Sequence, residues 1–173
     1  MDTSKSEINL KNLKGMFWEA NRAFLENHAS LLKRELSERC LCGALMHELN
    51  KQLEKKNLKK YYADIEFNRD EDNVKRISYK TDDGVYSKRI FTDIIVHSRG
   101  EVSLDNLIAL EMKKSTARAD AKERDKNRLS LLTSLYPYKY RLGVYYEINH
   151  KKRQILIEFY QNGKMVEVKT LDY

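Results

Sequence analysis

The sequence has few of the residues that crosslink a chain or break it into segments. Its 173 residues include two cysteines, one proline and six glycines. Cys40 and Cys42 lie two positions apart with no histidine at metal-ligand spacing, which argues against a disulfide framework and against a zinc site. No apolar run approaches the roughly 20 residues of a membrane span, and the first residues open into no secretory signal. We therefore expect reduced thiols, a cytoplasmic location and no membrane partner.

The overall composition is that of a folded, basic domain. Apolar residues make up 41% of the chain and charged residues 34%, which argues against intrinsic disorder. The length suits one compact unit, and neither a linker nor a repeat divides it, so we expect a single domain over 1–173. The net charge of +7 permits binding to a polyanion without requiring it. No glycine-rich phosphate loop is present, which argues against a nucleotide triphosphatase.

The first third of the chain has the pattern of helices. Residues 1–58 are rich in Leu, Glu, Lys and Ala, and we expect helices at about 13–26 and 37–56. Ser37 is a suitable N-cap for the second helix. Leucines at fourfold spacing in that helix predict its buried stripe, which comprises Leu41, Leu45 and Leu49.

From residue 61 onward the pattern predicts a sheet. Strands are expected at about 61–67, 89–97, 106–113, 140–148, 153–160 and 164–169, with one helix at about 117–135. Asn162-Gly163 predicts a hairpin between the last two strands. The stretch 68–87 is dominated by turn residues, and at most a short strand is expected there. A mobile flap and a regular hairpin are the two alternatives for it. The predicted fold is of the α/β (α+β) class, a central mixed β-sheet flanked by helices.

Two of the predicted strands carry carboxylates that a buried strand does not tolerate unpaired. Asp93 stands between Thr92 and an apolar run, and Glu111 follows another apolar run. Such acids must be ion-paired, hydrogen-bonded or bound to a metal. Lys113 lies two residues after Glu111 and therefore shares its side of the strand. This convergence predicts a Mg²⁺ site, because Mg²⁺ prefers carboxylate oxygens. The alternative is a structural ion pair with Lys113.

These residues resemble a known signature. Thr92-Asp93, then 17 residues, then Glu111-Met112-Lys113 resembles the PD-(D/E)xK motif of the restriction-endonuclease-like superfamily, with Thr92 in place of the proline. The resemblance implies a helix before a curved mixed sheet. It also implies that the two acids bind the metal and that the lysine acts on the attacking water.

The function that the resemblance implies is a Mg²⁺-dependent deoxyribonuclease of the endonuclease type, with Mn²⁺ as a substitute. Asp93, Glu111 and Lys113 would be catalytic, and the backbone carbonyl of Met112 would be a further ligand. A chain of this size has little room to recognise bases, so specificity would need a homodimer or a partner protein. One alternative is a non-catalytic module that keeps the fold and binds nucleic acid or protein. Another is a nuclease for RNA or for branched or single-stranded DNA.

A further acid lies at the start of the second predicted helix. Glu38 stands three residues before Leu41 and seven before Leu45, so helical geometry places it at the end of the buried stripe, facing the sheet. The resemblance also implies an acid on this helix, which makes Glu38 a candidate metal ligand. The alternative is an acid that favours the helix dipole in the first turn after Ser37.

The predicted helix at 117–135 carries basic residues at fourfold spacing. Arg118, Lys122 and Lys126 share one face, which suits either a track for DNA phosphates or a solvated helix surface. Asp125 instead aligns with Leu129 and Leu132 on the apolar face and is expected to turn inward. The pattern assigns it no definite role; a hydrogen bond that orients Lys113 or another group would be one use for it.

Overall fold

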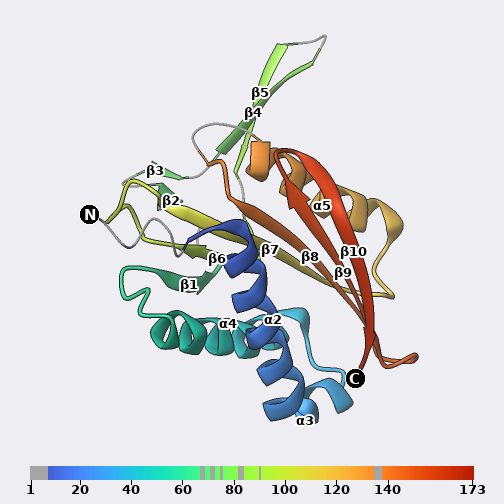
Figure 1. Cartoon of the computed structure of the whole chain (residues 1–173). Coiled ribbons are helices and arrows are strands. Elements are labelled where there is room, and N and C mark those ends of the chain that lie inside the picture. The colour runs from blue at the N-terminus through green and yellow to red at the C-terminus, as the bar shows by residue number, and fades with distance from the viewer. Residues whose placement is uncertain are drawn as a thin grey trace.

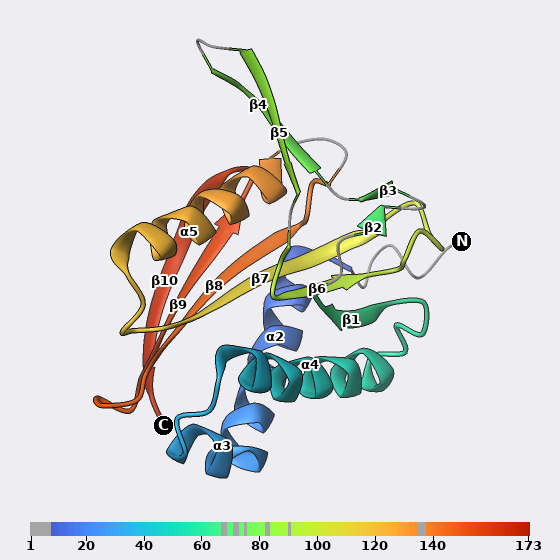
Figure 2. The same cartoon turned by 180° about the vertical axis from the view of Figure 1, so that it is seen from behind.

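The computed structural model places helices at the N-terminus, followed by a six-stranded mixed sheet with one helix packed on it (Figures 1 and 2). It describes residues 8–66, 91–134 and 138–173 in full. Between 67 and 90 it describes only the backbone of four short strands. The N-terminal helices therefore precede the sheet in sequence and cover part of it in space.

The bounds of the elements follow the sequence pattern closely. The helices are α2 (Leu10–Asn27), α3 (Ala29–Lys33), α4 (Glu38–Lys55) and α5 (Ala119–Ser134). The strands of the main sheet are β1 (Tyr62–Ile65), β6 (Ile94–His97), β7 (Asn106–Lys114), β8 (Leu142–Asn149), β9 (Gln154–Gln161) and β10 (Lys164–Asp172). Two small antiparallel pairs complete the list, β2 (Arg69–Asp70) with β3 (Asn73–Val74) and β4 (Arg76–Thr81) with β5 (Gly84–Arg89).

Capping side chains fix where the two long helices begin. The side chain of Asn9 accepts a hydrogen bond from the Asn12 N–H at 2.9 Å, and Ser37 Oγ accepts one from the Cys40 N–H at 3.3 Å. The predicted N-cap at Ser37 is thus confirmed, and the predicted stripe of leucines on α4 is buried. No described helix combines the length and apolar character that crossing a membrane requires.

The sheet has the order β1-β6-β7-β8-β9-β10. Only β7 and β8 are parallel, and α5 connects them. The other neighbours are antiparallel. The turn between β9 and β10 has positive φ at Asn162 (47°) and Gly163 (81°), as a two-residue Asn-Gly hairpin requires, which confirms that prediction.

The sheet is covered on both faces, because successive side chains of β8 point to opposite sides. Tyr146 packs against Phe17 and Phe24 of α2, with ring centroids 6.4 Å apart in both pairs. Its neighbour Tyr145 belongs to a second cluster under α5, which includes Leu129. α2 and α4 therefore share one face of the sheet with the larger core, and α5 covers part of the other.

Two sequence predictions differ from the structure. The strand expected at 89–97 begins only at Ile94, so Asp93 lies just before β6. Within 68–87 the expectation of at most a short strand is too low, because β4 and β5 form a regular hairpin of six residues each, which is one of the two alternatives considered. Turn residues at 70–73 and 82–84 outweighed the β-branched and aromatic residues beside them in the sequence pattern. Residues 1–7, 67–68, 71–72, 75, 82–83, 90 and 135–137 lie outside the described residues.

An acidic residue joins β1 to the end of β6. Asp64 Oδ2 lies 3.0 Å from His97 Nε2, and Arg99 donates to both carboxylate oxygens at 2.9 and 2.7 Å. Burial by itself would raise the pKa of Asp64. The hydrogen bonds and charges of Arg99 and His97 outweigh burial and hold that pKa below its ordinary value. Charge-assisted hydrogen bonds to His97 and Arg99 therefore hold the edge strand β1 against the end of β6.

We expect Asp64→Asn to destabilise the protein at neutral pH by about 1–2 kcal/mol, or roughly 3–6 °C in Tm. Because the folded pKa is lowered, the ionised Asp64 stabilises the protein above its unfolded pKa of about 3.9, and this contribution is lost as the pH falls through the folded value. Thermal melts from neutral to acidic pH should therefore converge for wild type and variant. Asp120→Asn, at an exposed ion pair, is the control and should change Tm little. Parallel melting curves at all pH values would contradict the role of Asp64.

Gly143 of β8 sets how closely α5 approaches the sheet. A Cβ atom there would lie 2.9 Å from the Tyr160 Cβ and 3.0 Å from the Thr133 Cγ2. We expect Gly143→Ala to destabilise the protein by about 1–3 kcal/mol through this overpacking. Gly15→Ala is the matched control, because its Cβ would meet nothing within 4 Å, and it should stabilise α2 by up to about 1 kcal/mol. Chemical denaturation of both variants measures the difference, and equal effects would contradict the close packing.

Candidate functional site

The register of β6 and β7 brings the two predicted acids together. Ile94 lies opposite Leu110 in the antiparallel pair, so Asp93, one residue before β6, falls beside Glu111. Asp93 Oδ2 accepts a hydrogen bond from the Met112 N–H at 2.8 Å. Burial raises the pKa of Asp93 above its ordinary value, although the bond from Met112 and the charge of Lys113 oppose the shift. The backbone of one strand thus anchors the acid that precedes the other.

Glu111 is the most deeply buried carboxylate of the site. Arg128 Nη1 lies 2.7 Å from its Oε1, and Oε2 is buried with no hydrogen-bond partner among the described residues. Burial raises the pKa of Glu111 well above its ordinary value, and the nearby Asp93 charge raises it further, while Arg128 opposes both effects. An ionised Glu111 therefore has only part of the compensation that a buried charge needs.

Lys113 lies between several oxygen atoms. Its Nζ is 2.9 Å from Asp125 Oδ2, 3.4 Å from Glu38 Oε2 and 4.0 Å from Asp93 Oδ2, and it donates to the Met112 carbonyl at 3.2 Å. Burial would lower the pKa of Lys113, but the surrounding carboxylates outweigh burial and raise it. The ammonium group is therefore charged at neutral pH, which makes Lys113 a hydrogen-bond donor rather than a base in this state.

Glu38 reaches the site from the first turn of α4. Its Oε1 accepts a hydrogen bond from the Lys114 N–H at 2.8 Å, and its Oε2 faces Lys113. The prediction that Glu38 faces the sheet is confirmed. Glu38 also lies in the first turn of its helix, where an acid favours the dipole, so the two roles considered for it from sequence are compatible.

Helix α5 contributes two further residues, one of which the sequence analysis missed. The inward direction expected for Asp125 is confirmed, and the group it contacts is Lys113, whose Nζ forms an ion pair with Asp125 Oδ2 at 2.9 Å. Arg128 was not singled out, although it lies three residues after Asp125 and beside Leu129 on the inward face. Besides Glu111, Arg128 contacts Asp125 Oδ1 at 3.1 Å and donates to the Phe91 carbonyl at 2.9 Å. The helical spacing could have identified it.

The charges of the site do not balance. Four carboxylates, those of Glu38, Asp93, Glu111 and Asp125, surround only two cationic groups. With every group ionised, two negative charges remain in excess, which a divalent cation would neutralise. The unpartnered Glu111 Oε2 fits the same requirement. In the described part of the chain, no three His, Cys, Asp or Glu side chains are already arranged around a metal position. Because Arg128 already contacts one oxygen atom of Glu111, a cation bound there would compete with Arg128 for this carboxylate.

The three basic residues expected to form a phosphate track are each paired with an acid. Lys122 Nζ lies 3.0 Å from Glu147 Oε1, Lys126 Nζ lies 2.7 Å from Glu158 Oε1, and the exposed Arg118 pairs with Asp120. Lys122 and Lys126 thus link α5 to β8 and β9. Their contacts favour a structural role, and contact of any of the three with phosphate stays a prediction.

The chain was compared with protein-family models, with curated proteins and with solved structures, and none of them matches it. The function is therefore inferred from the arrangement of the acids around Lys113 and from the resemblance carried by the motif residues.

The pairing of Arg128 with Glu111 predicts a strong energetic coupling. Arg128→Ala would leave Glu111 buried without its cation, and we expect it to lower the free energy of unfolding by about 3 kcal/mol, or roughly 6–12 °C in Tm. Adding Glu111→Gln should restore most of this loss, because the amide carries no charge. The measurement is thermal and denaturant unfolding of both single variants and the double variant in the presence of a chelator. If the two single effects simply add, the pair is not coupled in the folded protein.

Proposed function

We propose that this protein is a Mg²⁺-dependent nuclease that hydrolyses phosphodiester bonds of DNA, with a fold similar to that of the restriction-endonuclease-like superfamily. The observation that carries the proposal is the convergence of Asp93, Glu111 and Lys113 at one end of β6 and β7, with two more carboxylates than cations around them. The motif resemblance supports it independently, and so does the position of α4 before a mixed sheet.

The residues that would hold the ion are Asp93 and Glu111, with the Met112 carbonyl and Glu38 as further oxygen donors. Bound Mg²⁺ would polarise the scissile phosphate and lower the pKa of a water molecule. Burial disfavours the ionised form of Glu111, and a divalent cation at this carboxylate would compensate its charge. Asp93 is held in position by the Met112 N–H, so this ligand needs little reorganisation.

Lys113 would orient the attacking water and stabilise the negative charge that develops on the phosphate. The carboxylates around Lys113 keep it protonated, which favours this role over proton abstraction. Asp125 and Glu38 act as positioning residues, since they contact the ammonium group directly. Arg128 carries a second positive charge beside the same acids, and it would be released from Glu111 when that carboxylate binds a cation.

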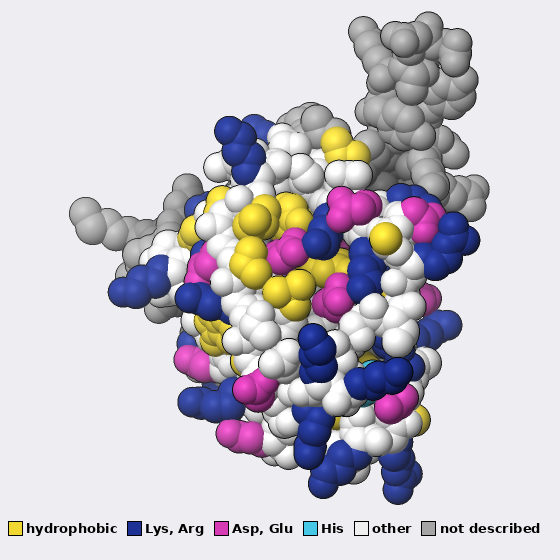
Figure 3. All heavy atoms as spheres, turned by 90° about the vertical axis from the view of Figure 1, so that its right-hand side faces the viewer, with side chains coloured by type: hydrophobic (Ala, Val, Ile, Leu, Met, Phe, Trp, Pro, Cys, Tyr) yellow, Lys and Arg dark blue, Asp and Glu magenta, His cyan; other side chains and the backbone are white. Residues whose placement is uncertain are grey.

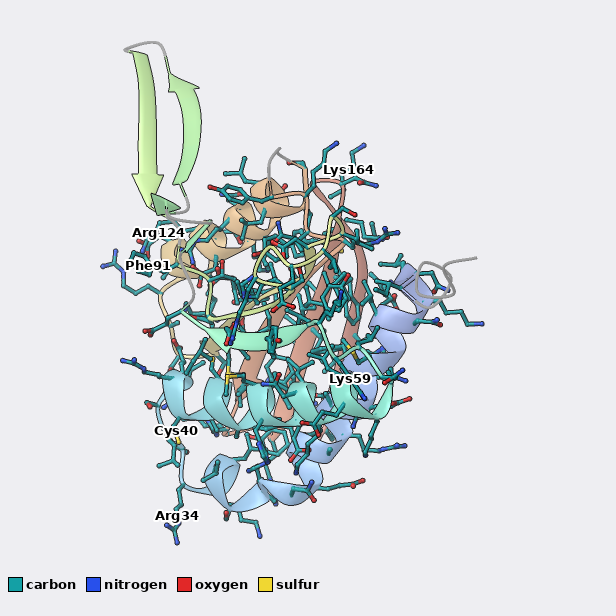
Figure 4. The ribbon with its side chains drawn as sticks, turned by 90° about the vertical axis from the view of Figure 1, so that its left-hand side faces the viewer. Arg34, Cys40, Lys59, Phe91, Arg124 and Lys164 are labelled. Carbon is teal, nitrogen blue, oxygen red and sulfur yellow. The ribbon has the colours of Figure 1, made fainter. Side chains whose placement is uncertain are left out.

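The rest of the surface supplies general affinity for a polyanion. The net charge of +7 favours association with DNA, and the affinity should fall as salt is raised. Phe91 lies two residues before Asp93, at the edge of the molecule in Figure 4, and is 50% exposed. Its carbonyl accepts a hydrogen bond from Arg128 at 2.9 Å. An aromatic ring in this place would stack on a base of a strand held at the site.

A non-catalytic binding module is the second candidate, and one observation favours it. Glu111 pairs with Arg128 and Lys113 pairs with Asp125, so each of these buried charges has a partner of opposite sign within the protein. These ion pairs would compensate the buried charges well enough if the acids had only a structural role. The two candidates differ in one measurable property, because a structural network has no need to bind Mg²⁺ or Mn²⁺.

The decisive experiment is DNA cleavage with Mg²⁺ or Mn²⁺, using plasmid and single-stranded substrates beside RNA. We expect Asp93→Ala and Lys113→Ala each to reduce the rate at least about 100-fold, because each removes a group that acts on the reacting phosphate. Lys114→Ala is the matched control. Its side chain donates to the Glu35 carbonyl, away from the acids, so cleavage should be retained.

Calorimetric titration with Mn²⁺ separates binding from catalysis. Wild type and Lys113→Ala should bind the ion, and Glu111→Gln should bind it at least about tenfold more weakly, because one charged ligand is lost. Cleavage that survives both Asp93→Ala and Lys113→Ala would refute the assigned site. A wild-type protein that neither binds Mn²⁺ nor cleaves would favour the binding module.

A further inference from the structure

The sheet ends at a strand whose outer edge is open. β10 is the last strand in the order of the sheet, spans nine residues and pairs only with β9 among the described residues. Its outward N–H and C=O groups are therefore available to another strand. An edge of this length is a template for pairing, and proteins normally protect such an edge when it has no partner.

The side chains around this edge are also exposed. The exposed fractions of Met165, Val166 and Val168 are 50%, 48% and 44%, and together with Phe91 they are the most exposed large apolar residues described. They remain uncovered because α5 packs on β7, β8 and β9. Its C-terminal end reaches the turn before β10, where the Ser130 hydroxyl donates to the Gly163 carbonyl. Figure 3 shows apolar side chains gathered on this side of the molecule, interspersed with basic and acidic ones.

The charged side chains of β10 are complementary to those of a second, antiparallel copy of the same strand. If two copies of β10 run antiparallel with Val168 opposite Val168, then Glu167 of each copy lies opposite Lys169 of the other. Directly opposite residues of opposite charge stabilise a strand pair. Glu167 and Lys169 share one face of the strand, so both pairs form on the same side. Lys164 and Asp172 stand at the two ends, where opposite charges again approach each other.

Other symmetric registers lack this complementarity. A two-fold axis at Glu167 would place two glutamates opposite each other, and an axis at Lys169 would place two lysines opposite each other. A parallel pair in register would align every charge with its own copy. Like charges in directly opposite positions destabilise a strand pair. Among these symmetric pairings of two β10 strands, the charge pattern therefore favours the antiparallel register about Val168.

We propose that two copies of this chain associate through β10, antiparallel about a two-fold axis at Val168, so that one sheet continues across the dimer. The bulge between Met165 and Glu167 lies outside the three central pairs and does not interrupt them. A strand-edge contact is small compared with the area of a stable interface, so the dimer should be weak and concentration-dependent. This inference does not depend on the proposed nuclease activity.

The test uses sedimentation equilibrium of the full chain from about 10 µM to about 1 mM. We expect wild type to dimerise within this range. Glu167→Lys places lysines opposite lysines, and Lys169→Glu places glutamates opposite glutamates, so each variant should dimerise roughly tenfold more weakly or worse. The double variant Glu167→Lys with Lys169→Glu reverses both charges and should recover the affinity.

Mixing the two single variants gives the sharpest result. A heterodimer of Glu167→Lys with Lys169→Glu has lysines at both positions of one strand and glutamates at both positions of the other. All its central pairs are opposite in charge, so an equimolar mixture should associate although each variant alone does not. This outcome is not expected from a folding defect, since a misfolded chain would not be rescued by another variant.

The control is Lys59→Glu, which makes the same change of net charge as Lys169→Glu, at an exposed residue near the opposite edge of the sheet (Figure 4). It should leave dimerisation unchanged. Glu167 also contacts Lys14 of α2 at 2.6 Å, so circular dichroism of each variant should confirm the fold. A wild type that stays monomeric up to about 1 mM would overturn the proposal and leave the edge to a strand of another protein. Dimers that persist unchanged in both single variants would overturn it as well.

Discussion

The burial of Glu111 is the constraint around which the site is organised. A carboxylate removed from water loses much of its hydration free energy, which protein groups must replace. Here one oxygen atom meets Arg128, and the other meets no described hydrogen-bond donor. The nearby Asp93 makes ionisation harder still. This carboxylate is therefore stabilised either by a proton or by additional positive charge, and the second option suits a site that binds a cation.

The topology of the sheet explains why these groups meet. The antiparallel register of β6 and β7 places Asp93 beside Glu111, and the alternation of side chains along β7 places Lys113 on the same face. The parallel step from β7 to β8 requires a long connection, and α5 supplies it. That helix returns over the same face of the sheet, which brings Asp125 and Arg128 to the acids. The site thus depends on one strand pair and on the helix that follows it.

The sequence allowed most of this arrangement to be predicted, for identifiable reasons. The helices and central strands have strong apolar periods, and Lys113 could be assigned to the side of Glu111 from strand geometry alone. The inward direction of Asp125 followed from its helical spacing, whereas its contact with Lys113 required the fold. Arg128 has a suitable helical position as well, and it was missed because an arginine on a polar helix is ordinarily solvated. The pairing of β4 with β5 was only one of two possibilities, because turn residues before the hairpin and at its tip obscured the strand pattern.

The position of Lys113 limits the chemistry that the site can perform. Four carboxylate groups near two cations leave an excess of negative charge, and this excess raises the pKa of Lys113. A lysine in that environment holds its proton more tightly than a free one, so it is a poor base until the charge around it changes. A divalent cation would supply that change by neutralising the acids, which would weaken their hold on the ammonium group. In the proposed function, cation binding and the protonation of Lys113 would therefore be coupled through the same carboxylates.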